Sequence, residues 1–460
     1  MSRPVEEALR AALWPGDPGY DEARRVWNGM IDRRPAVIAR CSDAADVAAA
    51  VRYATATGLA VTVRGGGHNV AGLALADDAL LIDLSPMRSV EVDPVRRLAV
   101  AGGGALLADL DGATAPHGLA CPVGVVSETG LGGLALGGGY GWLARKWGLT
   151  CDHLMAAEVV LADGSTVRVS EENRPELLWG LRGGGGNFGV VTRFTLRLRP
   201  VDDVWVRSAV YPVEQAGDAL RAYRHAMPSQ PDDLQLVGAF KRAPAADWIP
   251  ARLHGQPVLA FTTVWLGAEG GPEAAAELFA DRPPAGSFDR VMPFAELQAM
   301  GDGSEPAGRR YYTTSGYLAD LPADAVEVLV RYAVDGLTRY STIDLGYFRG
   351  AVARVDDDST AFPSRDASFI CSASAAWDDP AGDDHGRSWA GGLLRDLGPW
   401  RSEGSYVNYT QRSGRSAAEV YGAHRYARLA ALKAEVDPAN LFRGNHNIAP
   451  RPLASEGRLR

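Results

Sequence analysis

The sequence predicts an α+β protein in which a second domain is inserted into the first. Three observations support this prediction. Short apolar strands alternate with a helix in the N-terminal part, and three glycine-dense stretches lie within the first 200 residues. After Pro200, strand-like and amphipathic helical pieces alternate up to about residue 395, and the tail then resumes the sequence type of the N-terminal part. We therefore expect one domain from residues 1–200 and 396–460, with residues 201–395 as the insert.

Length and composition exclude several classes of protein. A chain of 460 residues with 46% hydrophobic content can build two or three domains with real cores. Its net charge of -9 gives no electrostatic reason to bind nucleic acid or an anionic membrane. No secretory signal and no apolar run of bilayer length is visible, and the four cysteines form neither a disulfide framework nor a zinc spacing. We expect a cytoplasmic protein without a metal site, either a monomer or a homodimer.

The N-terminal elements are predicted from the residues that begin and end them. Residues 1–35 look helical and then turn-rich, with a proline- and glycine-rich break at residues 14–19. Ser42 or Asp43 is expected to cap a helix over residues 44–57, which Gly58 ends. Apolar, β-branched runs predict strands at residues 36–41, from residue 61, and at residues 80–84 and 97–101.

The first glycine-dense stretch is Val61-Thr-Val-Arg-Gly-Gly-Gly-His-Asn69. A strand that ends in consecutive glycines can coil so that several backbone N–H groups point at one anion. Arg64 would add a positive charge at the mouth of this loop, and His68 would lie at its far end. An ordinary glycine turn is the alternative. Two more glycine-dense stretches, at residues 130–141 and 183–189, favour one large phosphate-bearing cofactor.

A nicotinamide dinucleotide site is not indicated by the glycines at 102–104. The dinucleotide motif needs glycine, one residue, glycine, two residues and glycine, whereas Ala105, Leu106 and Leu107 follow here. Further along the chain, Asp163-Gly164 predicts the turn of a hairpin over residues 159–169. In the insert, residues 258–265, 325–335 and 343–355 are examples of the alternating strand-like and helical pieces.

With these stretches identified, the chain resembles the FAD-linked oxidases of the vanillyl-alcohol oxidase superfamily, in the berberine-bridge-enzyme-like branch. The motifs that carry the resemblance are the loops at residues 64–69, 132–141 and 183–189, the segment Tyr406-Val-Asn-Tyr409, and the C-terminal runs at 437–443 and 445–448. The resemblance implies a two-part FAD-binding domain around an inserted substrate domain built from an antiparallel sheet plus helices.

The resemblance also implies how FAD is held. In that family the histidine of the first loop bonds covalently to the flavin 8α-methyl group, which places His68 in that role. The other cofactor-binding residues that the motifs imply are Arg64, Gly65, Gly66, Gly67, Asn69, Thr129, Gly130, Gly132, Gly133, Leu134, Gly137, Gly138, Tyr140, Gly189, Val190, Asn408 and Asn445. Bicovalent members add a cysteine, but Val126 stands at that position and Cys121 falls five residues earlier. Attachment through His68 alone is therefore expected.

The catalytic assignment follows the same resemblance. Alkaloid-type members carry a carboxylate base on a strand that is aligned here with residues 350–355, which contain no acid before Asp356. The remaining family solution is the tyrosine that closes the Tyr-x-Asn-Tyr motif, which makes Tyr409 the expected base, with Tyr406 in support. A phenol of pKa near 10 needs nearby positive charge or hydrogen bonds to act in this way.

Several aromatic residues are candidate walls for the substrate, although a core role is as plausible for each: Tyr311, Tyr312, Tyr347, Phe348 and Trp377. Three functions remain open at this point. The first is an oxidase that transfers a hydride from a small aromatic or polyketide-type metabolite to flavin N5 and is reoxidised by O2. The second is an oxygenase that works through a flavin-N5-oxide, which labelled oxygen in the product would reveal. The third is a non-catalytic flavoprotein.

Overall fold

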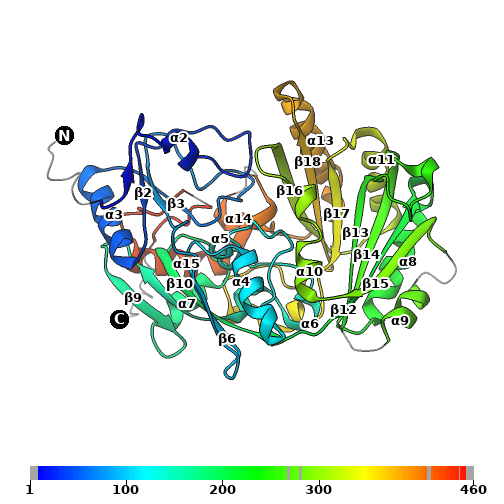
Figure 1. Ribbon diagram of the computed structural model, residues 1–460, viewed down its shortest axis with the longest axis horizontal. Helices are drawn as coiled ribbons and strands as arrows, with labels where there is room; N and C mark the ends of the chain where they lie inside the picture. The colour runs from blue at the N-terminus through cyan, green and yellow to red at the C-terminus, as the bar shows by residue number, and fades with distance from the viewer. Residues whose placement is uncertain (1–8, 267–269, 279–281, 412–415, 445, 452–460) are drawn as a thin grey trace, which may run out of the picture.

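The structure is a computed structural model that describes residues 9–266, 270–278, 282–411, 416–444 and 446–451. Figure 1 shows two parts side by side. The N-terminal strands and the C-terminal helices form one part, and a large sheet with its own helices forms the other. Among the described residues, no helix is both long and apolar enough to cross a membrane.

The first sheet has the strand order β1-β2-β4-β3, in which the last three strands are parallel. Its strands are β1 (Ala12–Leu13), β2 (Val37–Arg40), β3 (Val61–Arg64) and β4 (Leu80–Asp83). Helix α3 (Ala44–Thr57) packs its apolar side chains against this sheet. The Asp43 carboxylate accepts a hydrogen bond from the Asp46 N–H at the start of α3, and Gly58 ends the helix at φ 72°. The predicted helix and its two ends are confirmed.

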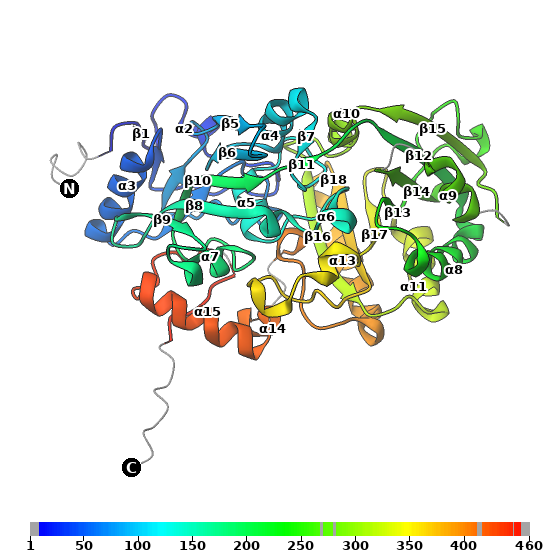
Figure 2. The same cartoon turned by 90° about the horizontal axis from the view of Figure 1, so that it is seen from below.

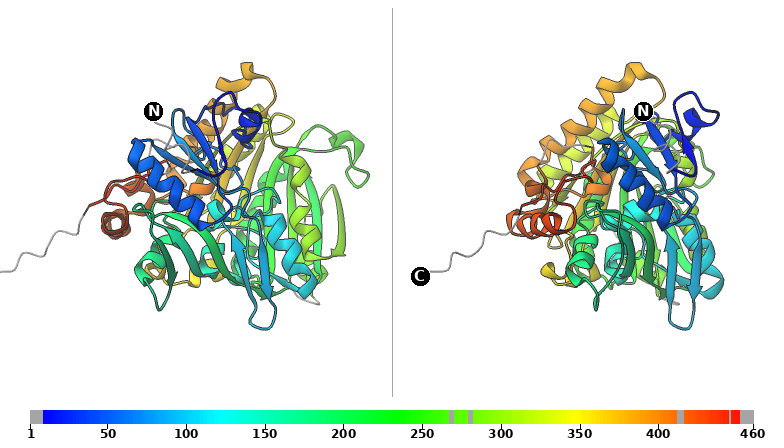
Figure 3. Two further views of the ribbon diagram at one scale, coloured as in Figure 1. Left: turned by 60° about the vertical axis from the view of Figure 1, so that its left-hand side comes forward. Right: turned by 90° about the vertical axis from the view of Figure 1, so that its left-hand side faces the viewer.

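The second sheet is antiparallel, with the order β5-β6-β10-β8-β9. Its strands are β5 (Val90–Asp93), β6 (Leu98–Gly102), β8 (Leu154–Val160), β9 (Thr166–Ser170) and β10 (Val190–Arg197). The helices of this part are α2 (Tyr20–Ala23), α4 (Leu107–Thr114), α5 (Leu131–Leu136), α6 (Ala144–Trp147), α7 (Pro175–Leu181), α14 (Ala417–Tyr421) and α15 (Ala423–Val436). The C-terminal helix α15 packs against α7, as Figures 2 and 3 show. Residues far apart in sequence thus share one core.

The third sheet has seven antiparallel strands in the order β15-β12-β14-β13-β17-β18-β16. They are β12 (Val204–Pro212), β13 (Leu234–Arg242), β14 (Pro257–Trp265), β15 (Gly286–Met292), β16 (Arg310–Leu318), β17 (Thr342–Tyr347) and β18 (Phe369–Trp377). The accompanying helices are α8 (Ala216–Ala226), α9 (Gly271–Leu278), α10 (Phe294–Ala299), α11 (Ala323–Gly336), α12 (Ala351–Arg354) and α13 (Asp383–Asp396). A separate two-stranded pair is formed by β7 (Leu119–Ala120) and β11 (Arg199–Pro200). The α+β class and the antiparallel sheet of the insert are confirmed, whereas the domain limits at residues 200 and 396 stay a prediction.

The two faces of the seven-stranded sheet have different side chains because successive residues of a strand point to opposite sides. On β18, Phe369, Cys371 and Ala373 lie in the large core that α8, α11 and α13 help to build. The alternate residues Ile370 and Ser372 face the N-terminal part of the molecule and line a cavity there. One face of the sheet therefore stabilises the fold, and the other is available for binding.

One predicted element is wrong, and another lies partly outside the described residues. Residues 343–355 do not form one strand, because β17 ends at Tyr347 and residues 351–354 form the short helix α12. The turn between them has Gly350 at φ 74°, a conformation that favours glycine. Residues 9–35 contain only the two-residue strand β1 and the four-residue helix α2, so the helical pattern expected for the start of the chain does not extend into the described part.

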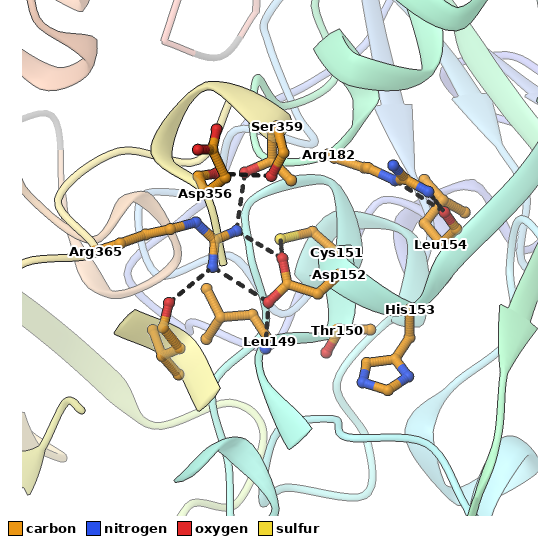
Figure 4. A network of polar contacts seen from close by, with 12 residues as sticks. Leu149, Thr150, Cys151, Asp152, His153, Leu154, Arg182, Asp356, Ser359 and Arg365 are labelled. Carbon is orange, nitrogen blue, oxygen red and sulfur yellow. Dashed lines mark hydrogen bonds and ion pairs between the residues drawn. The ribbon is translucent and has the colours of Figure 1, made fainter. Parts of the chain in front are cut away.

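A buried ion pair joins the segment between β17 and β18 to the N-terminal part (Figure 4). Arg365 Nη2 lies 2.6 Å from Asp152 Oδ1, and its Nη1 lies 3.2 Å from Asp152 Oδ2. The same carboxylate accepts a hydrogen bond from the Leu149 N–H at 2.8 Å. Because both charged side chains are almost fully buried and pair with each other, this contact holds the two parts together.

Candidate active site

A cavity of about 490 Å³ lies where the N-terminal part meets the seven-stranded sheet. Its walls include the three predicted glycine loops, the cavity-facing residues of β16, β17 and β18, and residues 406–409. The loops are therefore gathered in one place, although more than 100 residues separate the first loop from the third. One ligand in this cavity would contact all three loops.

The first two glycine loops touch each other through their backbones. A Cβ atom on Gly130 would lie 2.2 Å from the Gly66 nitrogen, and a Cβ atom on Gly66 would lie 2.5 Å from the Gly130 nitrogen. Such contacts with rigid backbone cannot be relieved by moving a side chain. Glycine is therefore required at both positions, and the backbone itself forms this part of the cavity wall.

Gly130→Ala is expected to destabilise the protein by about 1–3 kcal/mol and to weaken flavin binding, because the added methyl group pushes the two loops apart. Gly112→Ala is the matched control, since Gly112 is exposed on α4 and its Cβ would meet nothing within 4 Å. That change should leave the thermal unfolding midpoint unchanged or raise it. Equal midpoints and equal flavin content for the two variants would contradict the loop contact.

His68 lies in the cavity wall with one ring nitrogen free. Its Nε2 atom is buried and has no hydrogen-bond partner among the described residues. Burial lowers the pKa of the imidazole to about 4, so the ring is neutral at physiological pH. One face of the ring stacks on Trp27, with the ring centroids 4.2 Å apart. A buried, neutral imidazole with an unpartnered nitrogen is a candidate nucleophile.

Arg64 does not supply the free charge that was predicted for the mouth of the first loop. Its guanidinium forms a buried ion pair with Asp83, with Nη2 2.7 Å from Oδ2 and Nε 3.0 Å from Oδ1. The same guanidinium donates to the Ala23 and Arg25 carbonyl oxygens. The positive charge of Arg64 is therefore neutralised by Asp83, and the ion pair connects β3 to β4. Arg64 does not belong to the described cavity wall.

Most of the other predicted site residues do line the cavity: Gly65, Gly66, Gly67, His68, Asn69, Thr129, Gly130, Gly132, Gly133, Leu134, Gly137, Tyr140, Gly189, Val190, Tyr406, Asn408 and Tyr409. Gly138 stands behind the wall, where a Cβ would lie 2.6 Å from the Phe362 ring. Asn445 lies outside the described residues. Of the candidate substrate walls, Tyr311 lines the cavity, whereas the others belong to the surrounding structure: Tyr312, Tyr347, Phe348 and Trp377.

The cysteines are placed away from the cavity. Val126 lines it, but Cys121 is fully buried in the core beneath, and burial raises the pKa of its thiol far above the ordinary value. None of the four cysteines, all of which are described and buried, belongs to the cavity wall. Because the described wall has no cysteine, an attachment there would have to use a histidine, and His68 is the histidine of the first glycine loop.

Tyr406 and Asn408 hold the second glycine loop. The Tyr406 hydroxyl accepts hydrogen bonds from the Gly139 and Tyr140 N–H groups, both at 3.0 Å, and from Asn408 Nδ2 at 3.1 Å. Asn408 Nδ2 also donates to the Leu134 carbonyl at 3.1 Å. Burial raises the pKa of Tyr406 to about 12. The geometry gives Tyr406 a positioning role in the loop, and its predicted supporting role in catalysis stays a prediction.

Tyr409 lines the same cavity as two carboxylates, those of Glu305 and Asp344. Burial raises the pKa of Tyr409 well above 10, with further contributions from Tyr406 and from Glu305. Glu305 has a pKa raised to about 7, first by burial and then by the charge of Asp344. Burial also raises the pKa of Asp344, although Thr342 Oγ1 donates to its carboxylate at 2.7 Å. Glu305 and Asp344 are therefore candidate proton acceptors in the same cavity as Tyr409.

Asp344 and Glu305 were missed by the sequence interpretation. The aligned strand was placed at residues 350–355, which lie beyond the end of β17; the strand that lines the cavity does carry an acid, Asp344. Period-two alternation was the available signal, because Thr342, Asp344 and Gly346 face the cavity while Ile343 and Leu345 enter the core. Glu305 precedes β16 in an irregular segment and had no comparable signal.

Comparison with known proteins agrees with this site. An FAD binding domain model matches residues 35–170, and a berberine and berberine-like model matches residues 405–449. The chain is 32% identical over 451 residues to an (R)-6-hydroxynicotine oxidase of Paenarthrobacter nicotinovorans, covering 95% of this chain and 96% of that protein. The crystal structure of 6-hydroxy-D-nicotine oxidase from Arthrobacter nicotinovorans matches with a TM-score of 0.84 and 28% identity, over 98% of this chain and 100% of that chain.

A glucooligosaccharide oxidase of Acremonium strictum shares the fold. Its structure matches with a TM-score of 0.85 at 23% identity, over 97% of this chain and 99% of that chain. That protein carries a 6-S-cysteinyl, 8α-N1-histidyl FAD. In the present chain, the described cavity wall contains two histidines, His68 and His446, and no cysteine.

Proposed function

The chain belongs to the berberine-bridge-enzyme-like family of FAD-linked oxidoreductases, and we propose that it oxidises a small aromatic or polyketide-type metabolite. Its fold is that of the vanillyl-alcohol oxidase type. Bound FAD supplies a hydride acceptor whose electrons then pass to O2. The single observation that carries the proposal is the buried, unpartnered Nε2 atom of His68 in a cavity walled by glycine backbone.

The residues fit FAD and favour attachment through His68 alone. The neutral imidazole can bond to the flavin, and Val126 stands where a second, cysteinyl attachment would need a thiol. The glycine loops expose backbone N–H groups, which suit a diphosphate without any lysine or arginine. The described cavity wall indeed contains neither of these cationic residues.

On the substrate side, we propose that Tyr409 accepts the proton that leaves the substrate O–H or N–H. Burial makes this phenol resist ionisation, so we propose that Tyr409 passes its own proton on to Glu305 or Asp344, which line the same cavity, as it accepts the new one. A carboxylate with a pKa near 7 is matched to this task at physiological pH. Because a carboxylate takes up the Tyr409 proton in this proposal, no phenolate has to form, and no positive charge is needed to stabilise one.

The aromatic side chains at the sheet side of the cavity support an aromatic substrate. Trp142, Tyr311 and Tyr340 lie in the wall together with the hydroxyl groups of Thr313 and Ser374. Flat rings offer stacking surfaces, and the hydroxyl groups offer hydrogen bonds to a few polar substituents. A panel of aromatic carbinols and amines, mixed with the enzyme without air, should bleach the flavin. If only simple sugars bleached it, the proposed substrate class would be wrong.

His68→Ala is expected to abolish covalent attachment while leaving a folded protein that binds FAD reversibly. The change removes the histidine of the first glycine loop, which the proposed attachment uses, but it leaves the glycine loops and His446 in the wall intact. Mass spectrometry of a tryptic digest should find flavin on the wild-type peptide that contains His68, and acid precipitation should release all flavin from the variant. Cys121→Ser is the control and should retain covalent flavin, because Cys121 lies outside the cavity. Flavin joined to Cys121 would overturn the proposed single attachment.

A further inference from the structure

Trp27 occupies a short segment that lies between the first glycine loop and the residues that precede β16. The Trp27 N–H donates to the Gly67 carbonyl at 3.1 Å, and the Trp27 carbonyl accepts from the Gly308 N–H at 2.8 Å. Its indole Nε1–H donates to the Glu305 carbonyl at 2.9 Å. The side chain is 6% exposed. Three backbone contacts therefore hold this residue to both sides of the cavity.

The indole ring is clamped between two other rings. On one face lies the His68 imidazole, with ring centroids 4.2 Å apart and planes inclined by 21°. On the other face lies Tyr311, at 3.8 Å and 17°. Because both faces of the indole are covered and its N–H is bonded, its plane is fixed. The His68 ring, which stacks on that plane, is held nearly parallel to it.

We propose that Trp27 is the positioning residue for covalent attachment of FAD, holding the His68 imidazole so that a ring nitrogen stays directed at the flavin. This role rests on the proposed attachment through His68. Attachment joins a ring nitrogen of His68 to the flavin 8α carbon. The methyl carbon and the imidazole each lose one proton, and the two electrons left on the flavin pass to O2, which forms hydrogen peroxide.

The physical reason for this role is the freedom that His68 would otherwise have. The Nε2 atom has no hydrogen-bond partner to orient the ring among the described residues, so packing has to do so. Without the indole, the imidazole could turn about its side-chain bonds and leave the line of attack. A nucleophile displaced by about 1 Å reacts on the order of 10²-fold more slowly.

The test is the rate at which flavin becomes attached when apoprotein is mixed with FAD in air. We expect Trp27→Leu to slow attachment by about 10- to 100-fold, measured as the yellow flavin retained after acid precipitation over time. Reversible FAD binding, followed by quenching of flavin fluorescence, should change much less. Trp27→Phe keeps an aromatic ring for His68 to stack on and should restore most of the rate. If Trp27→Leu did not fold, Trp27→Met would be measured in its place.

Trp179 offers a matched control in the same part of the molecule. It is also 6% exposed, and its Nε1–H also donates to a backbone carbonyl at 2.9 Å, that of Asp358. It does not belong to the described cavity wall. Trp179→Leu should therefore lower stability to a similar degree while attachment keeps its wild-type rate.

The outcomes separate the two proposals. Attachment in Trp27→Leu at the wild-type rate, or equal slowing in Trp179→Leu, would overturn the role of Trp27 while leaving attachment itself intact. Wild-type protein without flavin on His68 would overturn the attachment, and the role of Trp27 with it. Slow attachment in Trp27→Leu, rescue by Trp27→Phe and normal attachment in Trp179→Leu would together support the positioning role.

Discussion

Tyr409→Phe is expected to slow the reduction of bound flavin by substrate about 10²- to 10⁴-fold, the contribution that a well-placed proton acceptor typically makes. The substitution removes one oxygen atom and little volume, so folding, flavin content and colour should survive. Anaerobic stopped-flow measurement of flavin bleaching reports this step directly. Reoxidation of the reduced enzyme by O2 should change much less, because it does not require removal of the substrate proton.

The pH dependence of flavin reduction should identify the group that receives the proton from Tyr409. Glu305 can accept only when it is ionised, and its pKa is about 7, so the rate should rise as pH increases through about 7. Glu305→Gln should remove or displace that rise, whereas Glu296→Gln should preserve it. Glu296 is the control, since its carboxylate pairs with Arg290 at 2.9 Å away from the cavity. Reduction of Tyr409→Phe within a few-fold of the wild-type rate would transfer the role of base to the carboxylates.

Lys433→Met is expected to destabilise the protein by about 3–5 kcal/mol, because it leaves the buried Asp437 carboxylate without its cation. The Lys433 ammonium group is fully buried and pairs with Asp437 at 2.5 Å. It also donates to the Asn187 and Phe442 carbonyl oxygens, at 2.6 and 2.9 Å. Since Asn187 and Phe442 line the cavity, the variant should also bind FAD more weakly. Thermal unfolding with and without added FAD measures both effects.

Lys146→Met is the matched control for that prediction. Lys146 pairs with Asp233 at the same distance, 2.5 Å, but the two side chains are 27% and 36% exposed. Water solvates both charges when the pair is broken, so the loss of stability should be about 0–1 kcal/mol. Equal losses for Lys433→Met and Lys146→Met would contradict the view that burial makes the Lys433 pair important.

Helix ends and tight turns could be predicted from the sequence, because they depend on residues that are close together in the chain. Asp43 and Gly58 bound helix α3 through side-chain capping and a left-handed glycine, both of which are visible in the sequence. The hairpin of β8 and β9 turns at Gly164, with φ 77°, as the Asp-Gly pair predicts. In contrast, the end of β17 was misplaced, since β-branched and small residues continue past Tyr347 in the sequence while the backbone turns at Gly350.

The sequence by itself determined that this is an α+β protein with three glycine loops, a histidine at the end of the first loop, and no cysteine at the neighbouring position Val126. Only the tertiary structure shows which side chains contact one another in the site. Arg64 forms an ion pair with Asp83, Asp344 lines the same cavity as Tyr409, and Trp27 stacks on His68. Residue type and backbone period are local properties, whereas these contacts join residues on different strands and loops. They exist only after the sheets have packed and water has been excluded, which is also what shifts the pKa values on which the proposed chemistry depends.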